Sequence, residues 1–153
     1  MTRTLLTLLA CLAAQPALAL SCLPPDPVAL YERARDAEES FMIIRGRILA
    51  EARVNLPREG KEAETPVRIE GLALTAEGFT EPFDRDATLR LTCAGPWCAN
   101  APSGGEVFMA VEVDGRDLIA EIGPCYFNQV EATDEGAARL LSCHQGGDCV
   151  TKY

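Results

Sequence analysis

The chain has 153 residues, of which 48% are hydrophobic and 24% charged, and its formal net charge at pH 7 is −9. This composition is that of one globular domain, and it excludes a disordered, collagen-like, coiled-coil or multi-span membrane protein. The acidic balance makes nucleic acid an unfavourable partner, because the chain would repel a phosphate backbone. The single histidine, His144, excludes any site that needs two imidazole ligands.

Residues 1–19 have the pattern of a secretory signal peptide. Arg3 precedes an apolar run from Leu5 to Ala14, and the segment ends in the cleavage motif Ala-Leu-Ala. The apolar run is too short to cross a bilayer, so an uncleaved anchor and lipidation at Cys11 remain only as alternatives. We expect export to the periplasm or the medium, with no membrane insertion after cleavage. The mature chain, residues 20–153, is expected to be one domain with a net charge of −10, because the leader removes one arginine and no acid.

The mature chain opens with a predicted helix and a long strand. Asp26 is placed to cap a helix whose first residue is Pro27, and apolar residues at helical spacing continue it to about Ser40. Phe41–Val54 then reads as a strand. Gly46 in its middle predicts a bulge or a sharp bend.

The middle of the chain alternates between short strands and connections. Alternating apolar residues predict strands over Val67–Thr75 and Ala87–Cys93. Glycine, proline and charged residues predict connections elsewhere, over Pro57–Pro66, over Glu77–Asp86 (which carries Phe79 and Phe83), and over Ala94–Gly105.

A hairpin and a helix end the chain. Apolar alternation predicts strands over Glu106–Val113 and Arg116–Ile122, joined by a turn at Asp114-Gly115. A short helix is expected over Asp134–Leu141. Five strands, one of them long and bent, favour an all-β fold with flanking helices, namely a five-stranded, disulfide-stabilised barrel of the OB type. An open five-stranded α+β sheet is the alternative.

Six cysteines remain in the mature chain, which predicts three disulfides in an exported protein. Glycines between Cys93 and Cys98, and between Cys143 and Cys149, allow each pair to close locally. Cys22 would then join Cys125. One alternative is a zinc site formed by the four locally spaced cysteines, and another is thiol redox chemistry at Cys93 and Cys98. In both cases the cysteines are spaced more widely than is usual for such sites.

Several short motifs follow one another in a characteristic order along the mature chain. They are Ser21-Cys22-Leu23-Pro24-Pro25-Asp26-Pro27, Thr92-Cys93-Ala94, Glu106-Val107-Phe108-Met109-Ala110-Val111, the Asp114-Gly115 turn, Gly123-Pro124-Cys125-Tyr126-Phe127 and Ser142-Cys143. Together with the order of elements, these motifs resemble the tissue inhibitors of metalloproteinases. That family is built on the netrin module, an OB-type barrel.

The resemblance implies a contact surface at the mature N-terminus. In that family an N-terminal cysteine places its amine on the protease zinc, and a disulfide pins it to a loop between strands. Here Leu20 occupies the matching position and the partner matches Cys93, so the pinning bond is absent, whereas Cys22–Cys125 has both ends. The implied contact surface, called the ridge below, comprises Leu20, Ser21, Cys22, Leu23 and Pro24 beside Thr92, Cys93, Ala94 and Trp97.

The residues favour binding over catalysis. No pattern of an activated nucleophile is present, so we expect no enzyme activity, no cofactor and no resident metal. His144 is expected on an exposed loop. Turn chemistry explains Asp114 and leaves Asp117 exposed. The hypothesis is an exported, non-enzymatic protein-binding module whose partner is a protein, an exported protease being one candidate. The alternatives are a metalloendopeptidase inhibitor that uses the N-terminal ridge and a thiol oxidoreductase at Cys93 and Cys98.

Overall fold

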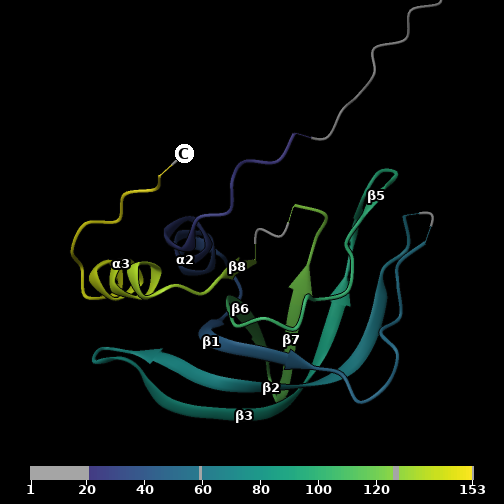
Figure 1. The fold of residues 1–153 in the computed structure, drawn as a ribbon, viewed down its shortest axis with the longest axis horizontal. Helices are drawn as coiled ribbons and strands as arrows, with labels where there is room; N and C mark the ends of the chain where they lie inside the picture. The colour runs from purple at the N-terminus through teal and green to yellow at the C-terminus, as the bar shows by residue number, and fades with distance from the viewer. Residues whose placement is uncertain (1–20, 59, 126–127, 153) are drawn as a thin grey trace, which may run out of the picture.

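The fold is a closed barrel with one helix before it and one after it (Figure 1). It is known from a computed structural model, which describes residues 21–58, 60–125 and 128–152. The predicted signal peptide and Leu20 lie outside the described residues, as do Tyr126 and Phe127. Within the described residues, no helix is long and apolar enough to cross a membrane.

The barrel strands follow the order of an OB-type fold. In chain order they are β1 (Phe41–Leu49), β2 (Ala63–Thr75), β3 (Gly78–Leu91), β6 (Val107–Asp114) and β7 (Asp117–Ile122). Around the barrel the order is β1-β2-β3-β7-β6, and β6 pairs back onto β1. These pairs are antiparallel except for β3 with β7. The predicted OB-type barrel is confirmed, and the open α+β sheet is wrong.

Three short strands lie outside the barrel, and the sequence pattern predicts none of them. β4 (Cys93–Ala94) and β5 (Trp97–Cys98) form a small hairpin, which apart from Cys93 lies in the segment expected to be a loop. β8 (Gln129–Glu131) pairs with β6. The predicted turn between β6 and β7 is present, but Asp114 pairs directly with Asp117, so the turn residues are Gly115, at a φ of 60°, and Arg116.

Strands β2 and β3 are longer than expected. The expected strands exclude two prolines that in fact lie within β2 and β3. Pro66 and Pro82 suggested connections, yet each sits where its strand has a partner on one side only. The β1 ladder stops at Arg68, and β7 joins β3 only from Thr88 onward. A proline on an unpaired edge removes no ladder hydrogen bond. Phe83, expected in a connection, therefore lies in a strand and is buried.

Of the bulge or sharp bend predicted at Gly46, the bulge is wrong, because β1 runs through Gly46 with no shift in register against β2. Gly46 lies directly opposite Gly71. A Cβ added at Gly46 would come within 2.9 Å of the Gly71 Cα. The glycine therefore allows a close approach of two backbones, which is the second common reason for glycine within a strand.

The two helices cover the outside of β6, so that this strand is buried on both faces. α2 (Pro27–Asp36) ends four residues earlier than expected, and α3 (Asp134–His144) ends three residues later. The barrel interior holds Met109 and Val111, whereas Phe108 and Ala110 pack beneath the helices. The sequence alternation indicates only the first of these two faces.

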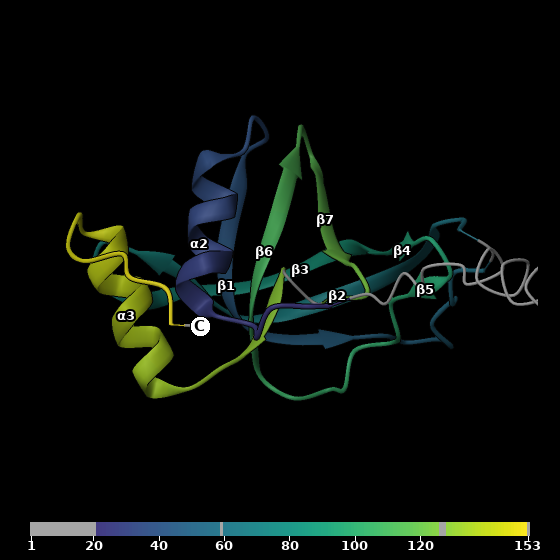
Figure 2. The same cartoon turned by 90° about the horizontal axis from the view of Figure 1, so that it is seen from above.

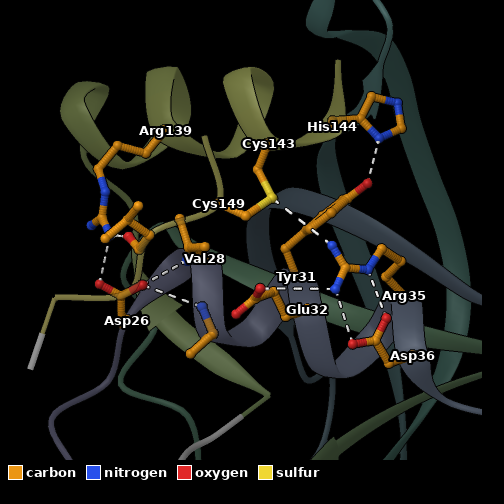
Figure 3. Close-up of a disulfide and its surroundings, with 12 residues drawn as sticks. Asp26, Val28, Tyr31, Glu32, Arg35, Asp36, Arg139, Cys143, His144 and Cys149 are labelled. Carbon is orange, nitrogen blue, oxygen red and sulfur yellow. Dashed lines mark hydrogen bonds and ion pairs between the residues drawn. A yellow bond between two sulfur atoms is a disulfide. The ribbon is translucent and has the colours of Figure 1, made fainter. Parts of the chain in front are cut away.

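Asp26 holds both helices and the C-terminal segment together (Figure 3). One carboxylate oxygen accepts the backbone N–H groups of Val28 and Ala29, as expected of a helix cap. The other oxygen accepts hydrogen bonds from the guanidinium of Arg139 at 2.8 Å and from the Lys152 backbone N–H at 3.2 Å. Burial alone would raise the pKa of Asp26, but these hydrogen bonds and the charge of Arg139 outweigh it and lower the pKa.

The three predicted disulfides are confirmed. Cys22 joins Cys125, and the pairs Cys93–Cys98 and Cys143–Cys149 close locally. The four sulfurs of the zinc alternative are all bonded to other sulfurs, so that alternative is wrong. Three disulfides in one small domain indicate an oxidising compartment.

Candidate functional site

A hairpin closed by a disulfide presents the only tryptophan of the chain. Cys93 and Cys98 are paired across β4 and β5 and also bonded, with Gly95 at a φ of 60° in the turn between them. Ala94 pairs with Trp97, whose side chain is 40% exposed. The two small strands and the disulfide fix the hairpin in one shape, so Trp97 is held in a defined position with part of its surface open to solvent.

The N-terminal segment before α2 is exposed and covalently held. Residues 21–25 are all exposed, and the side chain of Leu23 is 56% exposed. Cys22 ties the segment to Cys125, which is 103 positions away in sequence. Asp26, immediately after it, is buried under α3. The segment thus has a fixed point at Cys22 and another at Asp26, with two prolines between them.

The disulfides and two backbone hydrogen bonds link these two segments through the end of β7. The Thr92 N–H donates to the Ile122 carbonyl at 3.0 Å, and the Ala99 N–H donates to the Thr92 carbonyl at 2.9 Å. Ile122 lies three residues before Cys125, the disulfide partner of Cys22. Figures 1 and 2 agree that the segment from residue 21 runs away from α2 toward the β4–β5 hairpin.

The described part of the ridge is therefore the set Ser21, Cys22, Leu23, Pro24, Thr92, Cys93, Ala94 and Trp97. Thr92 and Cys93 are half-buried, whereas the other residues of this set are exposed. Their strand pairings and disulfides are those given above. Leu20, the predicted first residue of the ridge, lies outside the described residues.

One exposed apolar residue near the β4–β5 hairpin is not indicated by the sequence motifs. Leu56, in the connection between β1 and β2, is 51% exposed. Its neighbour Asn55 is fixed by two hydrogen bonds, from its backbone N–H to the Thr65 hydroxyl and from its side chain to the Glu64 carbonyl. Both views place this connection beside the β4–β5 hairpin. The only sequence signal is a leucine within a charged loop.

An acidic cluster around Arg90 lies where β2 begins and where β3 and β7 end. The guanidinium of Arg90 contacts Glu64 at 3.0 Å, Glu62 at 3.9 Å and Glu121 at 4.0 Å. Burial raises the pKa of Glu121, Arg90 partly offsets this, and the nearby carboxylates of Glu62 and Glu112 raise it further. One arginine faces three carboxylates, so this part of the surface carries a negative charge.

The expectation that His144 lies on a loop is wrong, because His144 is the last residue of α3. It is exposed, and its Nδ1 lies 3.1 Å from the hydroxyl of Tyr31. It is far along the molecule from the ridge, since α3 and the β4–β5 hairpin occupy opposite ends in both views. The structure therefore does not bring His144 into the predicted contact surface.

Comparison of the chain with protein-family models, with curated proteins and with solved structures finds no match.

Proposed function

We propose that this chain is an exported, non-enzymatic protein-binding module, located in the periplasm or secreted, and that the ridge is its contact surface. The observation that carries the proposal is the exposure of Leu23 and Trp97 on two segments that are each held by a disulfide. A fixed aromatic side chain is the typical anchor of a protein interface. Because the segments are already ordered, binding would cost little conformational entropy.

The charge around the ridge supports a partner with a basic rim. The cluster of Glu62, Glu64 and Glu121 exceeds the charge of Arg90, and the whole chain is acidic. Opposite charge at the rim accelerates association, and salt weakens this effect. The same acidic surface disfavours nucleic acid.

An exported metalloendopeptidase is the first class of partner to examine. The resemblance to the tissue inhibitors of metalloproteinases supports this class, and Cys22–Cys125 is the pairing that the resemblance implies. Cys93, however, is bonded to Cys98 and not to the N-terminal segment. The ridge here is thus built from two separately closed segments, which favours binding of a protein surface over the family's zinc contact.

The test is capture of proteins exported by the same cells on the immobilised mature protein. We expect a captured protein to bind Trp97→Ser and Leu23→Ser variants at least tenfold more weakly, the loss of a central apolar anchor. Leu72→Ser is the matched control, because Leu72 is 38% exposed, close to the 40% of Trp97, and lies in β2 on the barrel wall between Arg45 and Pro82. Equal binding by the parent and both ridge variants would contradict the proposal.

A further inference from the structure

A pocket of about 260 Å³ lies between the two helices and the barrel, away from the ridge. Its walls come from α2, from the start of β1, from the hairpin of β2 and β3, and from the end of α3. Ile43 and Ala73, both buried, form part of its lining. The residues that supply its chemistry are Tyr31, Phe41, His144, Arg35 and Glu81.

Three aromatic rings line this pocket, and two of them are fixed against each other. Tyr31 and His144 contact edge to face, with ring centroids 5.8 Å apart, and their polar atoms are hydrogen-bonded (Figure 3). His144 is adjacent to Cys143, whose disulfide to Cys149 anchors the end of α3. Phe41 supplies the third ring from β1. The faces of such rings attract cations.

The charges of the pocket favour a cation over an anion. The side-chain carboxylate of Glu81 has no hydrogen bond or ion pair with any residue that the structure describes, and Glu81 is open to solvent. Arg35 is the only cation among the lining residues, and it is already neutralised by Asp36, at 2.7 Å, and by Glu32, at 3.8 Å. An arriving anion would have to displace these carboxylates, whereas an ammonium group would meet an unpaired one.

We propose that this pocket binds a small organic cation, an ammonium or quaternary ammonium compound, between the rings of Tyr31 and Phe41 with Glu81 as its counter-ion. The pocket volume suits a ligand smaller than a typical drug. Its position at the helix end makes the site independent of the ridge, so each proposal can fail without the other.

Choline chloride is the probe, and the assay is a titration of the ¹⁵N-labelled mature protein followed by NMR. We expect saturable shifts for backbone amides lining the pocket, such as those of Tyr31, Phe41 and Leu74. The neutral isostere 3,3-dimethyl-1-butanol should bind at least about fivefold more weakly, because it lacks the charge that the rings and Glu81 recognise. Sodium acetate at equal ionic strength should leave these amides unshifted.

Two charge-matched variants decide the role of Glu81. Glu81→Gln should weaken choline binding by about fivefold, whereas Glu39→Gln, an exposed acid outside the pocket, should leave it within twofold. Phe41→Leu keeps an apolar side chain and should weaken choline more than it weakens the neutral isostere. Equal binding of choline and its isostere, or undiminished binding by Glu81→Gln in a folded protein, would overturn the proposal.

Discussion

Removal of the Cys22–Cys125 disulfide should destabilise the protein more than removal of either local disulfide. The bond closes 103 positions of chain, which corresponds to about 4.7 kcal/mol in the chain-entropy model. Cys93–Cys98 spans only 5 positions, and the same relation gives about 2 kcal/mol. The variant with both Cys22→Ser and Cys125→Ser should therefore lose roughly twice the stability lost by its Cys93→Ser, Cys98→Ser counterpart.

The assay is guanidinium unfolding of the oxidised proteins, followed by far-UV circular dichroism. Hydrogen exchange adds a local readout, since residues 21–25 have no second disulfide within the described residues. Faster exchange in this segment should accompany the loss of global stability. An equal loss in the two double variants, or a larger one for Cys93 and Cys98, would refute the assignment of the long-range bond as the main covalent contributor.

Four further outcomes follow from particular contacts. Asp26→Asn keeps a good helix cap but loses the charge, so it should lower the free energy of unfolding by about 2 kcal/mol at pH 7. Because the folded pKa of Asp26 lies below its ordinary value of 3.8, urea unfolding should show this deficit shrinking as the pH falls below about 3.8. Glu121→Gln should raise the melting temperature at pH 7, because burial raises the pKa of Glu121, and the gain should vanish below about pH 4.5. Gly46→Ala should destabilise by about 2 kcal/mol or more, measured by denaturant titration, whereas Gly105→Ala, whose Cβ would meet only the Ser103 hydroxyl at 3.8 Å, should be neutral. If the chain is a thiol oxidoreductase, reduction of insulin should depend on Cys93; the binding proposal predicts no such turnover.

The barrel could be predicted from the sequence because its strands alternate and its turns carry clear signals. The Asp114-Gly115 turn and the alternation before it locate the last hairpin, and the glycines between close cysteines indicate the two local disulfides. Prediction fails where tertiary context decides. Pro66 and Pro82 look like strand breakers, yet each lies on an edge that only the assembled barrel defines.

The candidate sites could be predicted only where a motif carries them. The ridge is what the resemblance in motif and cysteine order implies, whereas the exposure of Leu56 depends on how Asn55 bonds to β2. The pocket joins Tyr31, Phe41, Glu81 and His144, which lie up to 113 positions apart. No local spacing links such residues, so only the packing of both helices against the barrel reveals them.

Site-specific photo-crosslinking tests the central claim most directly. A photoreactive amino acid replaces Trp97 in one variant and Leu72 in another, and each is exported by the cells and irradiated in its own compartment. We predict a covalent adduct with another protein from position 97 and none from position 72, although Trp97 and Leu72 are nearly equally exposed, at 40% and 38%. The same adduct from both positions, or an adduct from position 72 alone, would contradict the assignment of the ridge as the binding surface.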